Sequence, residues 1–104
     1  MEVKKITRHE LIDAVYQNTR CEKRVVQEVV DSLLNELKKS LSEGNTIELR
    51  GFGTFEARRR KGRVKARNPK TGEELSVAPH YVAAFRAGME LKKSLLKLDA
   101  TEQK

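Results

Sequence analysis

Residues 58–74 read RRRKGRVKARNPKTGEE, and the rest of the chain is organised around this stretch. It holds eight of the 22 lysine and arginine residues but only two of the 15 acidic residues, so its net charge is +6 against +7 for the whole protein. From Lys61 to Arg67 every second residue is a cation, which predicts four cations on one face of an extended strand. The next five residues, NPKTG, are typical of a turn. The pattern predicts a basic two-stranded ribbon with Pro69 near its tip.

This ribbon has little apolar surface with which to fold. Val64 and Leu75 are its only large apolar residues, a lone hairpin is marginally stable in water, and like charges on one face repel. We therefore expect a polyanion as its partner. The alternative is a solvated or disordered charge run. We favour it less, because the run is internal, regularly patterned and interrupted by a turn.

Composition predicts one domain, residues 1–104, with a thin core that oligomerisation would support, since the chain has no Trp and three Phe. A pI near 9.8 favours nucleic acid or an anionic membrane surface as partner. No apolar run has the length of a membrane span and no signal-peptide pattern opens the chain, so we expect no membrane association. The single Cys21 indicates a reducing, cytoplasmic location rather than a disulfide framework.

The N-terminal part, about residues 1–45, predicts two helices. Thr7 and Glu10 have the spacing of a capping box, which predicts a helix over about residues 8–18. A second helix should begin at residue 22 or 23 and end at residue 43, before Gly44. Its apolar stripe is wider than one neighbouring helix needs. This width predicts a second copy of the chain on one edge; the alternative is that both edges are covered within the chain.

The pattern then changes to that of strands. Residues 46–50 and 54–57 alternate around a bend at Gly51-Phe52-Gly53, and the second strand continues into the ribbon. Residues 75–78 should form the returning strand, ended by Pro79. The sheet and arm thus occupy about residues 46–80, with the arm at 57–77, and a C-terminal helix should cover about residues 87–98. The predicted fold class is α+β.

Nothing in the chain indicates catalysis or a metal. His9 and His80 have no Cys, Asp or second His at ligand spacing, and no serine has the surroundings of a nucleophile. We expect no cofactor, no metal site and no enzymatic activity.

Three motifs carry a resemblance that covers nearly the whole chain: residues 51–55 (GFGTF), 67–72 (RNPKTG), and 85–88 (FRAG) followed by Leu91-Lys92. Together they resemble the HU/IHF family of bacterial histone-like DNA-bending proteins. The resemblance implies two N-terminal helices, a three-stranded antiparallel sheet with a long β-ribbon arm, and a short C-terminal helix. It also implies an intertwined homodimer or heterodimer whose arms wrap the minor groove of DNA, with the tip proline wedged between base pairs.

Carried over residue by residue, the resemblance identifies Pro69 as the wedge, Arg67 and Asn68 beside it, and the three Phe residues in the dimer core. The charge pattern and the apolar stripe of the second helix supply the other members of three sets of residues. The DNA-binding residues would be Arg58, Arg59, Arg60, Lys61, Arg63, Lys65, Arg67, Asn68, Pro69 and Lys70, with Pro69 intercalating. Second-rank phosphate contacts, for which ordinary surface charge is an equal alternative, would be Lys4, Lys5, Arg8, Arg86, Lys92 and Lys93. The dimer core would contain Val26, Val30, Leu33, Leu37, Phe52, Phe55 and Phe85.

The arm departs from the family pattern in length. The segment between Phe55 and Arg67 is one residue longer than in the commonest members. A one-residue slip would swap the faces of the strand unless a bulge near Gly62 absorbs the extra residue.

The function predicted first is low-specificity binding and bending of duplex DNA, with a preference for bent, nicked or flexible DNA, in a nucleoid-associated protein that compacts the bacterial chromosome. One alternative within the same fold is a site-specific, IHF-like bending factor. Another is an RNA-binding or ribosome-associated structural protein that uses the same ribbon.

Overall fold

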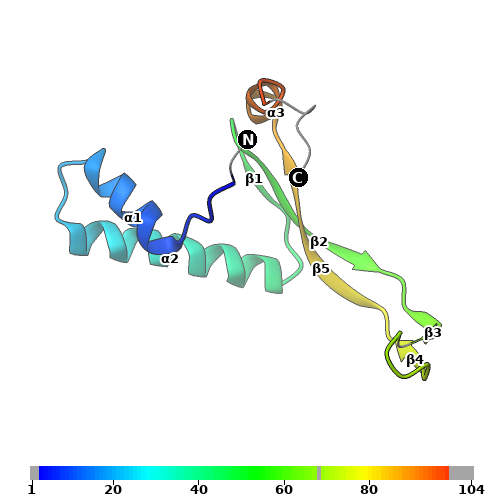
Figure 1. Ribbon diagram of the computed structural model, residues 1–104. Helices are drawn as coiled ribbons and strands as arrows, with labels where there is room; N and C mark the ends of the chain where they lie inside the picture. Colours follow the sequence, from blue (N-terminus) through cyan, green and yellow to red (C-terminus); the bar gives the residue numbers. More distant parts are fainter. Residues whose placement is uncertain (1–2, 68, 99–104) are drawn as a thin grey trace.

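The computed structural model describes residues 3–67 and 69–98 of the chain. Two helices are followed by five strands and a last helix (Figure 1). Their bounds are α1 Arg8–Gln17, α2 Lys23–Ser42, β1 Ile47–Leu49, β2 Gly53–Arg60, β3 Arg63–Arg67, β4 Glu74–Val77, β5 His80–Ala87 and α3 Met89–Leu95. The chain is extended: its radius of gyration is 18.9 Å, whereas a compact domain of this length has a value of about 13 Å.

The capping box predicted for the first helix is confirmed. Thr7 is the N-cap residue; its side-chain oxygen accepts a hydrogen bond from the Glu10 backbone N–H (3.3 Å), and the Glu10 carboxylate accepts one from the Thr7 backbone N–H (3.3 Å). These two bonds satisfy backbone donors that the first turn of a helix leaves without partners. The helix begins at Arg8, as the sequence predicted.

Helix α2 packs against α1 and ends where the sequence predicted, since Gly44 follows it with a φ of +86°. The contact buries Ile12 of α1 and Val26 of α2, which are 2% and 4% exposed. Two ion pairs join the helices: Arg8 to Asp31 at 2.6 Å and Lys23 to Asp13 at 2.7 Å. The hydrogen bond and charge of Asp13 raise the pKa of Lys23 above its ordinary value of 10.5.

The central sheet has three antiparallel strands in the order β1-β2-β5. β1 and β2 are joined by a tight turn in which Gly51 has a φ of +86°, a conformation that glycine adopts without steric cost. β2 and β5 pair over eight consecutive residues, from Gly53 opposite Ala87 to Arg60 opposite His80. The positions of β1 and β2 are therefore close to the prediction.

The third strand of this sheet is not where the sequence placed it. Residues 75–78 were predicted to return from the ribbon as a strand that ends at Pro79, and residues 75–77 do so, but they belong to a separate two-stranded sheet, β3-β4. The chain resumes as β5 directly after Pro79. Proline removes one backbone donor and interrupts the pairing, but the β-forming residues Tyr81, Val82 and Phe85 re-establish it. The sheet thus extends to residue 87 rather than 80.

The last helix is shorter than predicted. Residues 87–98 were expected to be helical, but Ala87 is still paired with Gly53 in the sheet, and α3 covers only Met89–Leu95. Gly88 is the N-cap residue, and its backbone N–H donates to the Phe52 carbonyl oxygen at 2.8 Å. This bond fixes the start of α3 to the β1–β2 turn.

Much apolar surface lacks a partner within the described residues. Ile12 and Val26 are the only buried apolar side chains among them, whereas Val29 and Leu33 on α2 are 62% and 55% exposed. Of the residues predicted for a dimer core, Val26 is buried, Val30 and Leu37 are partly exposed, and Leu33 is exposed. The surface left open on α2 is the wide apolar stripe recognised in the sequence. No helix in the described ranges is both long and apolar enough to cross a membrane.

Candidate nucleic-acid interface

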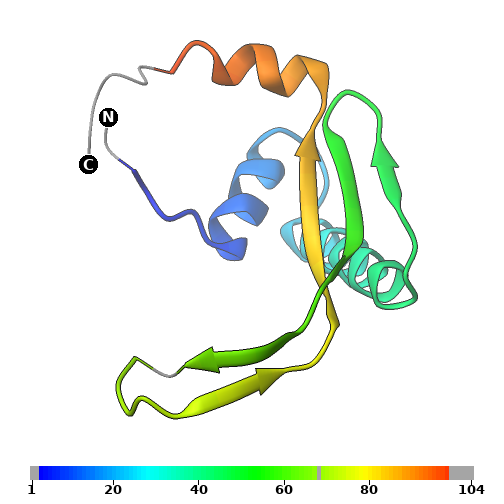
Figure 2. The ribbon, with the colours of Figure 1, turned by 90° about the vertical axis from the view of Figure 1, so that its right-hand side faces the viewer.

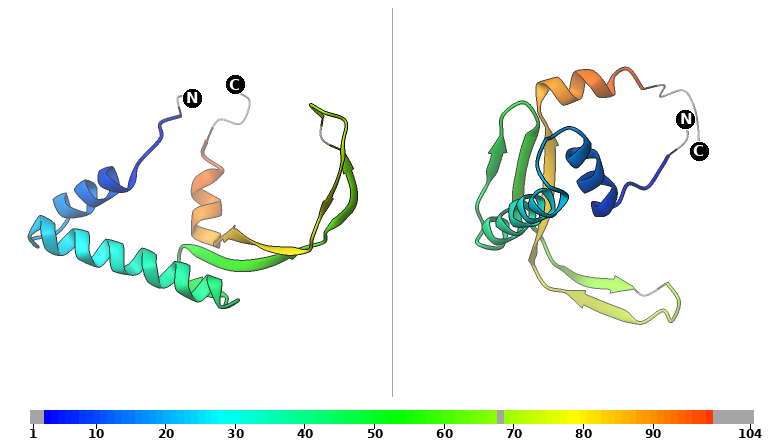
Figure 3. Two further views of the ribbon diagram at one scale, coloured as in Figure 1. Left: turned by 90° about the horizontal axis from the view of Figure 1, so that it is seen from below. Right: turned by 90° about the vertical axis from the view of Figure 1, so that its left-hand side faces the viewer.

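Two successive β-ribbons project from the body. The proximal ribbon is β2 with β5, and the distal ribbon is β3 with β4; the helices α1 and α2 lie on the opposite side of the molecule (Figures 1 and 3). Residues 61–62 and 78–79, which we term the joint, lie outside the strands and connect the two ribbons. Figure 2 shows that the chain changes direction here, so that the distal ribbon turns away from the line of the proximal one.

The joint requires glycine at position 62. A Cβ atom there would overlap the Val77 carbonyl oxygen and would lie 2.8 Å from the Pro79 nitrogen and 2.9 Å from the Ala78 carbonyl carbon. All three atoms belong to the backbone and cannot rotate away. The two segments of the joint therefore approach this closely only because position 62 has no side chain.

The distal ribbon contains a β-bulge. Arg63 pairs with Val77, but Ala66 pairs with Leu75 and Arg67 with Glu74, so β3 has one more residue than β4 over this interval. The extra residue lies close to Gly62, where the sequence indicated that a bulge would be needed. The predicted unbroken alternation of cations from Lys61 to Arg67 is wrong: Lys61 lies in the joint, and the bulge interrupts the pleat between Arg63 and Ala66.

The tip of the distal ribbon is a turn that includes Pro69. Pro69, Lys70 and Thr71 form the turn, and Gly72 follows with a φ of +75°. The Thr71 side-chain oxygen accepts a hydrogen bond from the Glu73 backbone N–H at 3.3 Å. Pro69 is exposed, as a wedge must be. Asn68, predicted beside it in the groove, lies outside the described residues.

Three aromatic rings fix the base of the proximal ribbon to the body. Phe55 and Phe85 are directly opposite one another on β2 and β5, with ring centroids 4.8 Å apart, and Phe52 from the β1–β2 turn lies 5.1 Å from Phe85. This cluster joins three segments in one chain. Gly53 lies beneath it, because a Cβ there would be 2.6 Å from the Phe85 ring.

The two faces of the proximal ribbon differ in chemistry. Phe55, Ala57 and Ala83 occupy the inner face, and the two alanines line a hollow beside the end of α2. Strand alternation places Glu56, Arg58 and Arg60 of β2 on the outer face, together with Arg86 of β5. Arg59 falls on the inner face, where its pairing partner is Tyr81. The block of consecutive arginines is thus divided between two faces.

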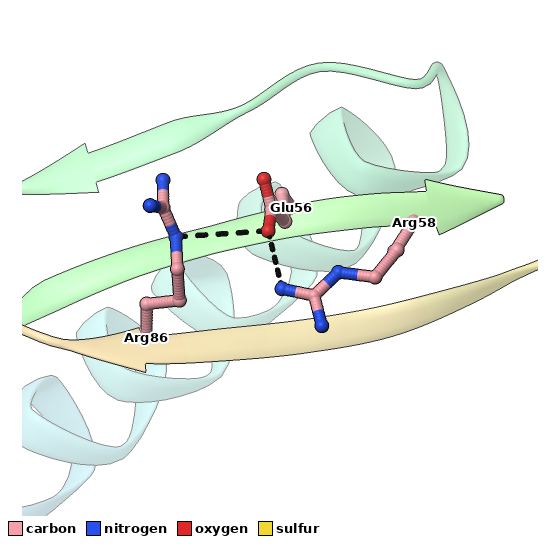
Figure 4. Close-up of polar contacts among 3 residues, drawn as sticks. All are labelled: Glu56, Arg58 and Arg86. Carbon is pink, nitrogen blue, oxygen red and sulfur yellow. Dashed lines mark hydrogen bonds and ion pairs between the residues drawn. The ribbon is translucent and has the colours of Figure 1, made fainter.

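One carboxylate on the outer face contacts two arginines (Figure 4). Glu56 Oε1 accepts a hydrogen bond from Arg58 Nη2 at 2.7 Å and lies 3.6 Å from Arg86 Nε. The Glu56 side chain is 25% exposed, against 45% and 64% for Arg58 and Arg86. The hydrogen bond from Arg58, supported by the charge of Arg86, holds the pKa of the Glu56 carboxyl below its ordinary value of 4.5. Sequence reasoning missed Glu56, because its cross-strand neighbour depends on the register.

The remaining predicted contacts are spread over the molecule rather than gathered. Lys4 and Lys5 are exposed in the segment before α1, and Arg8 on α1 is paired with Asp31. Lys92 and Lys93 are exposed on α3, and Lys61 is exposed in the joint. Arg63, Lys65 and Arg67 are placed by their backbone in β3, and Lys70 lies in the tip turn. Of the second-rank residues, Arg86 is the one that contacts a side chain of the proximal ribbon, Glu56, among the side chains that the structure describes.

Comparison with known proteins identifies the family to which a chain with this arrangement belongs. The family model described as "Bacterial DNA-binding protein" matches residues 6–96, which include both ribbons and all three helices. The chain belongs to the bacterial DNA-binding protein family. Its members include the proteins named HU and integration host factor, so the family that the sequence resembled is confirmed.

Relatives in the bacterial DNA-binding protein family carry both names. DNA-binding protein HU-1 of Halalkalibacterium halodurans is 43% identical over 83 residues, which are 80% of this chain and 91% of that protein. Integration host factor subunit alpha of Rhodospirillum rubrum is 40% identical over 92 residues, which are 88% of this chain and 87% of that one. The two identities are too close to choose between the names.

Solved structures of family members have the same fold. The HU chain in the Anabaena HU–DNA cocrystal structure matches with a TM-score of 0.78 and 35% identity, over 86% of this chain and 96% of that one. HU from Thermotoga maritima matches with a TM-score of 0.61 and 24% identity, over 86% and 97%. The predicted α+β fold with two N-terminal helices, a three-stranded sheet, an arm and a short last helix is confirmed.

Proposed function

We propose that this protein is an architectural DNA-binding protein that binds duplex DNA through the minor groove with low sequence specificity, bends it, and helps to compact the bacterial chromosome. It would act as a nucleoid-associated protein in the cytoplasm. The observation that carries the proposal is the exposed Pro69 turn at the end of a two-stranded arm that holds most of the net positive charge. The relative solved with DNA belongs to the same family and has the same fold.

Charge supplies affinity in this proposal. Lysine and arginine that neutralise phosphates release counterions, which favours binding without reading sequence and makes affinity fall steeply with salt. Residues 58–74 concentrate eight such cations with two acids. The outer face of the proximal ribbon adds Arg86 beside Arg58. Along the sequence, these cations extend from the proximal ribbon to the tip turn.

A second copy of the chain completes the proposed binding unit. Only two apolar side chains of the described residues are buried, and the radius of gyration of 18.9 Å is that of an open shape. Large apolar area exposed on α2 and around Phe52 and Phe85, which are 45% and 41% exposed, would be covered by an identical surface. The resulting homodimer presents two arms to one duplex.

In this proposal, Pro69 at the tip of the arm bends the DNA. An apolar side chain inserted between base pairs unstacks them at a cost of a few kcal/mol and kinks the duplex, which then meets more of the protein surface. Smooth bending of a short site costs on the order of 1–6 kcal/mol. DNA that is nicked, flexible or already bent requires less of this energy, so it should bind more tightly.

Replacing Pro69 with Ala tests the wedge. The bend, measured by fluorescence transfer between the ends of a 30-bp duplex, should decrease more than the affinity at low salt does, because the cations remain. Pro79→Ala, at the joint, is the matched control and should preserve the bend. If bend and affinity fall together for Pro69→Ala, the wedge role is wrong.

The name integration host factor among the relatives favours a second candidate, a site-specific bending protein. Binding to a random duplex and to a duplex chosen by selection separates the two functions. A preference of about 10³ or more for the selected duplex would favour the site-specific function. A competing A-form RNA duplex in the same assay tests the RNA-binding alternative, because RNA that displaces DNA at equal concentration and salt would support it.

A further inference from the structure

An acidic side chain occupies an unexpected place on the outer face of the proximal ribbon. Glu56 lies among Arg58, Arg60 and Arg86, on the face that alternation separates from the body. On a surface that meets phosphates, a carboxylate opposes binding by charge alone. If Glu56 favours DNA binding in spite of this repulsion, it must act through something other than its charge.

The geometry of the contacts suggests one. Arg58 and Arg86 stand on adjacent strands, four positions apart, so about 13 Å separates them along the ribbon. Both guanidinium groups nevertheless meet the same oxygen, Glu56 Oε1, at 2.7 and 3.6 Å. Without the carboxylate, two long and flexible side chains that repel each other would diverge.

We propose that Glu56 is a positioning residue that holds Arg58 and Arg86 side by side, so that both are presented together to the phosphate backbone of DNA where it meets the base of the arm. The inference rests on the proposed DNA-binding function and adds a role for a residue of opposite charge. Glu56 Oε1 accepts a hydrogen bond from Arg58 and forms an ion pair with Arg86, which leaves other N–H groups of both arginines available to phosphates.

Glu56→Gln distinguishes positioning from simple charge. Loss of one negative charge on a cationic face should tighten DNA binding if charge alone acts. If Glu56 positions the arginines, Glu56→Gln should instead weaken binding of a 30-bp duplex by about threefold or more, and the slope of log affinity against log salt should become shallower by about 1. The slope reports phosphate contacts, which a purely structural role would not change.

Glu48→Gln is the matched control. Glu48 is exposed on β1 opposite Thr54, so it occupies the same outer face and carries the same charge. In the described part of the chain it contacts no cation. Its substitution should leave DNA binding unchanged or make it slightly tighter. Equal weakening by both substitutions would overturn the positioning role.

A double-mutant cycle identifies the arginine through which Glu56 acts. In an Arg58→Gln background, Glu56→Gln should no longer weaken binding. Thermal melting of each variant shows whether it is folded. Should Glu56→Gln unfold the protein, Arg58→Lys and Arg86→Lys keep the charge but lose the planar group; each should then weaken binding, and unchanged binding by both would overturn the proposal.

The outcomes also separate this inference from the proposed function. Wild-type protein that fails to bind the duplex at low salt would refute the proposed function itself. Wild-type protein that binds, with a Glu56→Gln variant that binds equally well or better, would refute only the role of Glu56.

Discussion

The proximal and distal ribbons are built from adjacent parts of the same two chain segments, yet only one of them is regular. β2 and β5 keep one register over eight residue pairs, whereas β3 and β4 shift by one residue within five. The proximal ribbon has Phe55, Phe85, Ala57 and Ala83 on its inner face, where the rings of Phe55 and Phe85 pack against each other. The distal ribbon has no such face, because RVKAR and ELSV hold few large apolar residues.

The difference shows what fixes a register. Where the apolar side chains of one face pack together, a slip of one residue would separate them, so the pairing is strongly specified. Where neither face is buried, an extra residue costs little and is accommodated as a bulge. The proximal ribbon is therefore held by packing, and the distal ribbon is free to be shaped by its partner. Four experiments test this division, in order of decreasing expected effect.

The largest effect should come from neutralising the cations of the joint and of the distal ribbon. Changing Lys61, Arg63, Lys65 and Arg67 together to Gln removes charge without removing packing. Each lost phosphate contact lowers the salt slope by about 0.9, so loss of three or four contacts per chain should weaken binding at physiological salt by about 100-fold or more. Melting should remain within a few degrees of wild type. An unchanged slope, measured by titration at several salt concentrations, would place the DNA-binding surface elsewhere.

Gly53→Ala should destabilise the body. The new Cβ would lie 2.5 Å from the Arg86 carbonyl oxygen and 2.6 Å from the Phe85 ring. Overpacking at such a site costs about 1–3 kcal/mol, which is roughly 4–8 °C in melting temperature per kcal/mol for a domain of this size. Differential scanning calorimetry measures the fall in melting temperature. A melting temperature equal to that of wild type would show that the ring cluster is loosely packed.

Gly62→Ala is the counterpart at the joint. The Cβ would overlap backbone atoms of Val77 and Pro79, so the two segments of the joint must move apart locally. We expect the melting temperature to stay within a few degrees of wild type, while amide chemical shifts change across the joint and DNA affinity falls by about threefold. Gly72→Ala is the comparison, because it strains the backbone of the tip turn, where φ is +75°, without any overlap within 4 Å of the new Cβ. A fall in melting temperature as large as that of Gly53→Ala would mean that the joint belongs to the folded body.

The smallest effect concerns pH. The pKa of Glu56 is depressed below 4.5 in the folded protein, so its contribution to stability is present above the unfolded pKa and is lost as pH falls through the lower, folded value. In NMR titrations the Glu56 carboxyl should titrate below its ordinary value, and Arg58→Gln should raise that pKa toward it. Titration of Glu56 at its ordinary value in wild type would mean that the ion pair does not persist in solution.

Local signals in the sequence were sufficient to predict where helices α1 and α2 begin and end. The Thr7–Glu10 capping box and the apolar stripe before Gly44 act within one or two turns, so the bounds of α1 and α2 could be predicted closely. The tip turn at Pro69 and the bend at Gly51 are equally local. The family followed from short motifs in a fixed order.

Features that depend on pairing could not be predicted in the same way. Pro79 ended the predicted strand, although pairing resumes one residue later because the opposite strand continues. The faces of the distal cations depend on a bulge that local alternation does not show. Glu56 could not be linked to Arg86 without the register of β2 against β5, since 30 residues separate them in sequence.

The bulge in β3 has a consequence for protein engineering. Beyond Arg63, counting odd and even positions from the body no longer tells which residues share a side with those of β2. A chimaera that gains or loses the extra residue without the matching bulge would exchange the two sides of the distal ribbon, whereas one that loses the residue and the bulge together would keep them. Arms should therefore be exchanged together with their joint and bulge, as one module.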